Sequence, residues 1–253
     1  MKFASLFISH GAPTLPLSRL PAREFLAGLG ASLPRPRAVV VVSPHWLTRE
    51  RAVKSPPRFT TWHDFSGFPD ELYDLEYEAP GDARLRDRVR DLLGKAGAGA
   101  VPSDDLRLDH GAWVPLLLMY PKADVPVVQV SATMDTPRDY FELGRALKPL
   151  AAEDVLLIGS GGLVHNLREV EFDSADVPDW AQGFADWTAE RLETGDWEAL
   201  CDYRSRAPLA ARAHPTEDHF LPLFFAGGAG AAASRLHDTF AHGGLSMATY
   251  GFL

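Results

Sequence analysis

The chain has a single cysteine, Cys201, among its 253 residues. One cysteine cannot form a disulfide within the chain, and it excludes metal sites built on cysteine pairs. This cysteine usage favours a reducing compartment. Cys201 itself lies in a helical-looking stretch with no catalytic pattern around it, so we expect it to be a packing residue.

Long hydrophobic runs are also absent. No stretch approaches the roughly 18 consecutive apolar residues that a membrane-spanning helix needs. The apolar run at residues 3–8 is shorter than the hydrophobic region of a secretory signal, and no small-residue cleavage site follows it. We therefore expect a cytoplasmic protein without a membrane partner.

Positive charge is scarce relative to negative charge, with 25 Lys and Arg against 34 Asp and Glu and a net charge of −9. This balance argues against a nucleic-acid partner, because such binding depends on Lys and Arg at the phosphates. The hydrophobic fraction of 46% is that of an ordinary globular protein. With no internal repeat and no clear boundary, we expect one catalytic domain over residues 1–253, although two small domains would also fit the length.

Three short apolar runs lead directly into histidines. Residues 3–9 precede His10, residues 38–43 precede His45, and residues 154–160 precede His165. Runs of this kind predict strands that are buried on both faces. We expect an α/β fold with a central, largely parallel or mixed sheet flanked by helices. Because ligands collect at the carboxyl ends of such strands, we also expect a metal site there.

The rest of the chain alternates helical and extended patterns. The aromatic stretch 56–80 predicts a long ordered loop, and the Gly- and Ala-rich stretch 227–233 predicts another loop. Apolar spacing predicts helices over residues 15–30, 82–96, 109–119, 137–152, 178–193 and 197–205, and further strands over 125–131, 235–241 and 245–252.

Six of the nine histidines stand in five short sequence blocks that also contain glycine or proline. Glycine lets the backbone approach a ligand closely, and proline stiffens the turn that aims a side chain. There is no His-Glu-x-x-His and no cysteine pair, so the spacing by itself gives no standard zinc signature. The five blocks are Ser9-His-Gly-Ala-Pro13, Ser43-Pro-His-Trp46, Leu108-Asp-His-Gly-Ala-Trp-Val-Pro-Leu116, Gly159-Ser-Gly-Gly-Leu-Val-His-Asn166 and His214-Pro-Thr-Glu-Asp-His-Phe-Leu-Pro-Leu223.

These blocks, in this order, resemble the signature blocks of the class III extradiol ring-cleavage dioxygenases, and most closely the branch that resembles 4,5-DOPA dioxygenase. The resemblance implies that a catechol-type ring is opened with O₂ at a mononuclear, non-haem Fe(II). It further implies that His10, His45 and a third residue near the C-terminus hold the metal. We place that third ligand at His219, with His214 and Glu217 as competitors. Three neutral imidazoles also suit Zn(II), so zinc could occupy the same site.

The resemblance also implies roles around the metal. His165 falls in the block of the acid/base histidine, although Gly161 and Gly162 would also let it reach the metal as a ligand. His110 would donate a hydrogen bond to superoxide or substrate. We assign His214, Trp46 and Trp113 to substrate binding, with core packing as the alternative for the two tryptophans.

Two other classes of function remain open at this stage. One is a metal-binding interaction protein without catalysis, and the other is a zinc-dependent hydrolase that uses metal-bound water. The partners implied by the resemblance are a small catecholic substrate and O₂. The identity of the catechol, the side of the diol that is cleaved, and whether the protein forms a homo-oligomer are not determined by the sequence.

Overall fold

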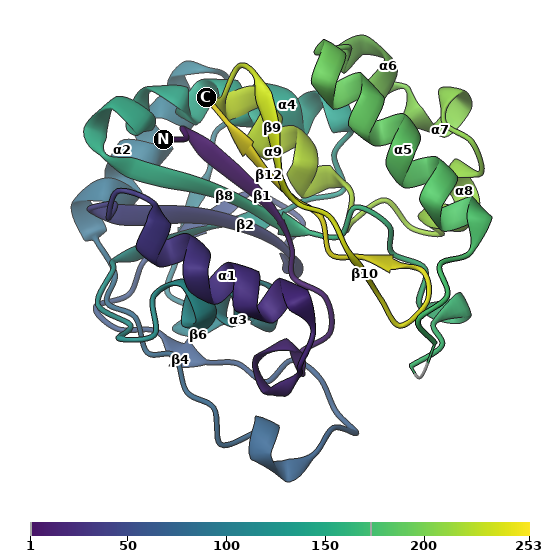
Figure 1. The fold of residues 1–253 in the computed structure, drawn as a ribbon. Helices are drawn as coiled ribbons and strands as arrows, with labels where there is room; N and C mark the ends of the chain where they lie inside the picture. The colour runs from purple at the N-terminus through teal and green to yellow at the C-terminus, as the bar shows by residue number, and fades with distance from the viewer. Residues whose placement is uncertain (1, 173) are drawn as a thin grey trace.

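An eight-stranded mixed sheet forms the centre of the computed structural model, which describes residues 2–172 and 174–253 (Figure 1). The strand order is β5-β3-β7-β2-β8-β1-β12-β9. The bounds are β1 (Ser5–Ser9), β2 (Ala38–Leu47), β3 (Ala52–Lys54), β5 (Val101–Ser103), β7 (Val127–Ala132), β8 (Val155–Gly161), β9 (Ala233–His237) and β12 (Thr249–Phe252).

The middle of the sheet is parallel and its edges are mixed. β7, β2, β8 and β1 pair in parallel, whereas β12 pairs antiparallel with both β1 and β9. The three strands that lead to His10, His45 and His165 are therefore neighbours, with β8 between β1 and β2. Their carboxyl ends meet at one edge of the sheet, as the sequence predicted. The α/β class with a mixed sheet flanked by helices is confirmed.

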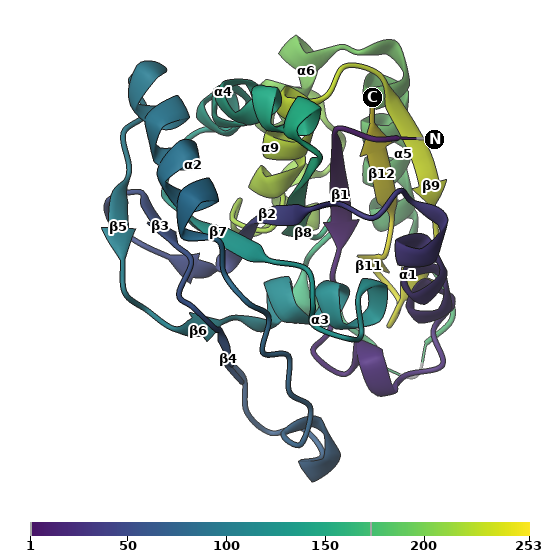
Figure 2. The ribbon, with the colours of Figure 1, turned by 90° about the vertical axis from the view of Figure 1, so that its left-hand side faces the viewer.

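Helices cover both faces of the sheet (Figure 2). Alternate residues of one strand serve the two faces: Val40 and Val42 belong to one buried cluster, and Val39 and Val41 to the other. The first face packs against α2 (Ala83–Lys95), α4 (Pro137–Leu147) and α9 (Leu221–Ala229). The second packs against α1 (Pro21–Ser32) and α3 (His110–Met119). Burial on both faces explains why these strands read as continuous apolar runs.

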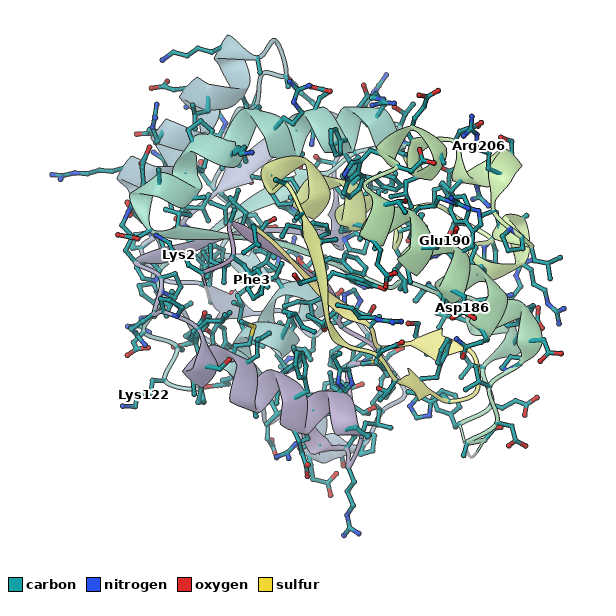
Figure 3. All side chains as sticks on the ribbon, turned by 45° about the horizontal axis from the view of Figure 1, so that its top comes forward. Lys2, Phe3, Lys122, Asp186, Glu190 and Arg206 are labelled. Atoms are coloured by element: carbon teal, nitrogen blue, oxygen red, sulfur yellow. The ribbon has the colours of Figure 1, made fainter. Side chains whose placement is uncertain are left out.

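One further helix, α5 (Asp179–Thr194), adds to the first face. Trp180, Phe184 and Leu192 of α5 are buried, whereas Asp186 and Glu190 are exposed, and Figure 3 labels both along this helix. The remaining short elements are β4 (Thr60–Thr61), β6 (Arg107–Leu108), β10 (Phe240–Ala241), β11 (Leu245–Ser246), α6 (Trp197–Cys201), α7 (Tyr203–Arg206), α8 (Ala210–Ala213) and the 3₁₀ turns η1 (Leu15–Leu17), η2 (Asp70–Leu72), η3 (Lys148–Glu153) and η4 (Leu167–Glu169).

The prediction of a loop over residues 227–233 is wrong for its first three residues, which end helix α9. The glycines there serve close packing. A Cβ on Gly228 would meet the carbonyl oxygen of Phe141 in α4 at 1.9 Å, and a Cβ on Gly227 would meet the Trp197 ring at 1.8 Å. Glycine composition thus marks a tight helix crossing here, which local sequence cannot distinguish from a flexible loop.

Other observed boundaries differ less from the predicted ones. The helix expected over residues 15–30 divides into η1 and α1, because Pro21 begins a new helix at its first position. The aromatic stretch 56–80 is the long excursion that was predicted, and in Figure 1 it reaches away from the sheet as the blue segment. Within the described residues, we find no helix long and apolar enough to cross a membrane.

Candidate active site

His10 follows the last residue of β1 and is almost fully buried, with 2% of its surface exposed. Gly11 takes a φ of +66°, a conformation that glycine adopts without strain, and so turns the chain away directly after the histidine. The Nδ1 atom of His10 lies 3.0 Å from Oγ of Ser160, a residue of the neighbouring strand β8. This contact orients the imidazole so that its other nitrogen, Nε2, faces His45.

His45 lies within β2, beyond the point where the sequence predicted the strand to end. Ser43 pairs with Ser131 of β7, but the next pair in the ladder is Leu47 with Ala132. Three residues of β2, including His45, therefore have no counterpart on β7. Such irregularities re-aim a side chain, and here they bring His45 to the carboxyl edge of the sheet.

His219 comes from the turn just before α9. The carbonyl oxygen of His219 accepts a hydrogen bond from the Gly162 backbone N–H at 2.9 Å. A Cβ on Gly161 would meet the same oxygen at 2.2 Å, so only glycine lets the end of β8 approach this turn. The Nδ1 atom of His219 lies 2.5 Å from a carboxylate oxygen of Asp218.

His110 is the first residue of α3. Asp109 caps that helix by accepting a hydrogen bond from the Ala112 N–H. Asp64, from the aromatic loop, accepts from the backbone N–H of His110 at 2.9 Å and lies 3.0 Å from its Nδ1. The same carboxylate oxygen of Asp64 is 3.5 Å from Nδ1 of His45.

The ring nitrogens of these histidines converge. Nε2 of His45 lies 3.1 Å from Nε2 of His10 and 3.2 Å from Nε2 of His219. Two nitrogens that bind one metal at about 2.0–2.1 Å, with an angle of roughly 90–110° between the bonds, lie about 2.9–3.4 Å apart. His110 also offers a ring nitrogen within 4.8 Å of those of His10 and His45. The cluster thus contains a histidine triad that could hold a metal ion. It consists of His10, His45 and either His110 or His219.

The hydrogen bonds around the cluster assign the protons. Ser160 donates its one hydroxyl proton to the Gly111 carbonyl, so toward His10 it acts as an acceptor, and Nδ1 of His10 carries the proton. The carboxylate of Asp218 likewise places the proton of His219 on Nδ1, and the Asp64 carboxylate, 3.5 Å from Nδ1 of His45, favours the same tautomer of His45 by its charge. All three Nε2 atoms then present lone pairs to one another. Such a set of acceptors needs a cation between them, and an Nδ1–H held by an outer partner is typical of metal-binding histidine.

Burial keeps the imidazoles neutral, which is the form that binds metals. Burial lowers the pKa of His45 to about 4 and that of His219 to about 3. Burial also places the pKa of His10 well below its ordinary value, and the neighbouring histidines lower it further. At neutral pH the three rings are therefore uncharged, and their lone pairs are free.

His165 stands beside this triad. Its ring stacks on that of His219 with 3.6 Å between centroids and 5° between planes. The backbone N–H of His165 donates to the Ala213 carbonyl at 3.0 Å, which fixes the turn after β8. Burial lowers the pKa of His165 to about 4, so this side chain is neutral at neutral pH and can accept a proton.

A cavity of about 340 Å³ opens over the histidines, a volume within the range of small-molecule sites. Its floor consists of His10, His45, His110, His165 and His219. The walls are apolar and come from four separate segments, including the aromatic loop and the residues that follow η4. The apolar wall residues include Phe65, Phe68, Leu167, Val170, Phe172 and Leu245.

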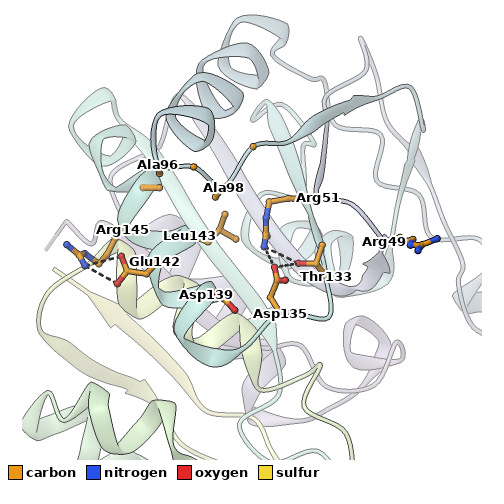
Figure 4. A pocket seen from close by; sticks show the side chains of 13 residues that line it. Arg49, Arg51, Ala96, Ala98, Thr133, Asp135, Asp139, Glu142, Leu143 and Arg145 are labelled. Carbon is orange, nitrogen blue, oxygen red and sulfur yellow. Dashed lines mark hydrogen bonds and ion pairs between the residues drawn. The ribbon is translucent and has the colours of Figure 1, made fainter.

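A larger cavity, of about 730 Å³, lies elsewhere (Figure 4). This charged groove is lined by α4, by the residues after α2 and by Arg49, Arg51, Thr133 and Asp135, and no histidine lines it. Some of its charged side chains pair with each other, Arg51 with Asp135 and Arg145 with Glu142, whereas Arg49 and Asp139 line it outside these pairs. Two of the three arginines in its described lining are therefore already paired with carboxylates.

Three predicted substrate-binding residues lie away from the histidine cavity. His214 is fully buried, with Nε2 2.9 Å from the Leu163 carbonyl oxygen, so it contacts the turn that carries His165. Trp113 is fully buried and donates its indole N–H to the Trp62 carbonyl. The Trp46 ring lies under the ammonium of Lys54, 4.0 Å from the ring centre. None of the three lines the cavity, and each has a packing role instead.

Glu217, the other competitor for the third ligand position, lies in an ion pair. Its carboxylate accepts from the Arg204 guanidinium at 2.9 Å. Two residues that hold the histidines, Asp64 and Ser160, were not identified from the sequence. Ser160 stands within a recognised block, but Asp64 lies in the aromatic loop, 46 residues before its partner His110, and no local signal connects the two.

The chain belongs to a family of aromatic ring-opening dioxygenases. Residues 21–253 match the family described as the catalytic LigB subunit of aromatic ring-opening dioxygenase. The chain is 39% identical to "4,5-DOPA dioxygenase extradiol" of Beta vulgaris, over 98% of this chain and 96% of that protein. It is 38% identical to the protein of the same name from Escherichia coli (strain K12), over 90% of this chain and 85% of that one.

A solved structure agrees with this membership. The crystal structure of an uncharacterized protein from Escherichia coli K12 superposes with a TM-score of 0.82 at 33% sequence identity. The match covers 98% of this chain and 99% of that one. The resemblance to extradiol dioxygenases expected from the five histidine blocks is thereby confirmed.

Proposed function

We propose that this protein opens the ring of a catechol-type compound with O₂, by extradiol cleavage, at a mononuclear non-haem metal held by His10, His45 and His219. The observation that carries the proposal is the convergence of three Nε2 lone pairs, 3.1 and 3.2 Å apart along the series His10, His45, His219. Family membership supports the reaction class, since the chain's relatives include proteins named extradiol dioxygenases.

His219 is the better third ligand for two reasons. Its Nε2 lies 3.2 Å from that of His45, within the spacing expected for two nitrogens on one metal. The ring nitrogens of His10, His45 and His110 lie within the looser limit of 4.8 Å of one another. Asp218 also orients the His219 ring through Nδ1, as carboxylates commonly do for metal-binding histidines. We propose Fe(II) as the working metal, and zinc as an ion that the same donors accept.

When bound, Fe(II) would supply open positions for both catechol oxygens and for O₂, and it would lower the pKa of the catechol hydroxyls. The protein's own residues would do the rest. His165, neutral and in the cavity floor, would accept a proton from a catechol hydroxyl and return it later in the reaction. Nδ1 of His110 donates a hydrogen bond to Asp64, so its Nε2 would accept a hydrogen bond from the second hydroxyl, in place of the donor role that the resemblance implied.

The apolar walls would exclude water and hold the ring flat between Phe65 and the segment that follows η4. Both atoms of O₂ enter the ring-opened product, so the reaction needs no outside reductant.

A single catalytic domain over residues 1–253 and a cytoplasmic location remain predictions.

Oxygen uptake tests the proposal. The protein, reconstituted anaerobically with Fe(II), should consume one O₂ per catechol and form a yellow, conjugated semialdehyde. A monophenol of the same size is the matched control, because it offers one oxygen to the metal instead of two. The zinc-loaded protein should bind the catechol without oxygen uptake, since Zn(II) has no accessible redox change. Equal turnover by both metal forms would reject the proposal in favour of a hydrolase.

A further inference from the structure

The walls of the histidine cavity are apolar, whereas its floor is built from imidazoles. Among the described residues that line the cavity, none is Lys, Arg, Asp or Glu. A substituent on the substrate ring would therefore meet hydrocarbon side chains above the histidines. A carboxylate buried there would lose its hydration without gaining a cationic partner, which is costly.

Two of the wall residues are unusually exposed for their type. Leu167 is 65% exposed and Phe172 is 66% exposed, and both stand at the cavity on the segment after His165. Across the cavity, Phe65 and Phe68 pack edge to face, with 5.4 Å between ring centroids, and are half-buried. Exposed apolar surface at the mouth of a cavity is typical of a surface that a ligand covers.

Two carboxylates, those of Asp64 and Asp218, lie behind the floor, where they contact His110 and His219, and further charged side chains line a neighbouring cavity that shares the wall residue Val170. This residue lines both the histidine cavity and a second cavity of about 490 Å³, whose wall includes Arg168, Glu171 and Arg212. Arg212 already forms an ion pair with Glu169 at 2.6 Å. None of these groups lines the histidine cavity itself.

We infer that the preferred substrates are catechols with an apolar, uncharged substituent, an alkyl or aryl group that covers Phe65 and Phe68 on one side and Leu167 and Phe172 on the other. This inference rests on the proposed function and names its substrate class. It departs from the compound for which the relatives are named, DOPA, which carries both an ammonium and a carboxylate.

Equilibrium binding under anaerobic conditions gives the first test, because no turnover occurs without O₂. Dissociation constants of catechol and of 4-methyl-, 4-ethyl- and 4-propylcatechol should fall about three- to fourfold per added carbon, as expected for about 0.8 kcal/mol per buried CH₂. The similarly sized 3-(3,4-dihydroxyphenyl)propionate, and DOPA, should bind at least about tenfold more weakly than 4-propylcatechol. Equal or tighter binding of the propionate would overturn the inference.

Substitutions in the cavity wall test whether these side chains cause the dependence of binding on alkyl chain length. Phe172→Ser and Leu167→Ser should flatten the dependence on chain length, whereas Met134→Ser, at a position that is 86% exposed and does not line the cavity, should leave it unchanged. A dependence that survives both wall variants would overturn the inference. So would an Arg168→Gln variant that selectively weakens the propionate or DOPA, because the charged end would then occupy the second cavity.

The outcomes separate this inference from the proposed function. If the alkylcatechols bind in the expected order but are not cleaved when O₂ is admitted, the dioxygenase proposal fails and the binding preference stands. If catechols are cleaved but the charged ones are preferred in binding and in kcat/KM, the dioxygenase proposal stands and this inference fails.

Discussion

The histidine cavity and the charged groove show two opposite ways of arranging polar groups at a surface. The groove is about twice as large, 730 against 340 Å³, and holds several charged side chains. Four of them lie in ion pairs, such as that of Arg145 with Glu142 at 2.9 Å. The cavity has no permanently charged lining residue among those described, yet three of its imidazoles turn lone pairs toward each other.

The difference teaches that converging acceptors mark a metal site better than cavity size or charge does. A matched ion pair at the surface is complete as it stands and is worth little. Converging nitrogen lone pairs are incomplete without a cation, and the fold maintains them through outer partners at Ser160, Asp64 and Asp218. Four predictions test this contrast.

The largest effect is expected from removing a ligand. His219→Ala should abolish stoichiometric metal binding and turnover, because only two nitrogens of the triad remain. Metal content after Fe(II) reconstitution and desalting measures this directly. The matched variant His110→Ala should keep the metal, since we place His110 beside the substrate. If His110→Ala loses the metal and His219→Ala retains it, the triad is the set of His10, His45 and His110.

Removing the proposed acid/base group comes next. His165→Ala should retain metal and anaerobic catechol binding, but slow turnover by about 10²–10⁴-fold, the usual contribution of general acid–base catalysis. Metal content and turnover must be measured on the same preparation of the variant. Full turnover in a metal-loaded variant would reject the role, and loss of metal would show that His165 is a ligand.

A smaller effect is expected at the outer partners. Asp218→Ala removes the acceptor of the His219 Nδ1 proton and should weaken metal affinity by about 10–100-fold, as loss of such partners typically does. Competition with a chelator of known affinity measures the change. Asp218→Asn keeps an acceptor oxygen and should recover part of the affinity; no difference between the two variants would contradict the role of Asp218.

The smallest effect is expected in the groove. Arg145→Ala breaks the exposed ion pair with Glu142, in which the side chains are 61% and 51% exposed. Stability should change by less than about 1 kcal/mol. Catechol turnover should equal that of the unaltered protein. A substantial loss of turnover would show that the groove takes part in function after all, and would break the contrast between the two regions.

Much of this arrangement could be predicted from the sequence. The apolar runs before His10, His45 and His165 identified three strands, and burial on both faces explains why those runs were so clear. The five histidine blocks identified the family. Strand neighbours β1, β8 and β2 then bring the histidines to one edge, a consequence of parallel topology.

What could not be predicted depends on contacts between distant segments. Asp64 binds His110 across 46 residues of chain, and nothing local marks that aspartate among many. His214 stands in a strong motif, but a motif does not reveal that its ring lies in the core, where Nε2 reaches the Leu163 carbonyl. The irregular pairing of β2 after Ser43 likewise depends on its partner strand.

Asp64 is followed directly by Phe65, so one stretch of backbone carries both a partner of the histidines and a wall of the cavity. A change at Phe65 that alters the fit of a substrate also displaces the group that orients His110 and His45. The opposite wall, at Leu167 and Phe172, contributes none of the contacts that orient the histidine triad. We therefore expect relatives of this protein, and laboratory-evolved variants, to acquire new substrates through the segment after His165 while the aromatic loop stays nearly fixed.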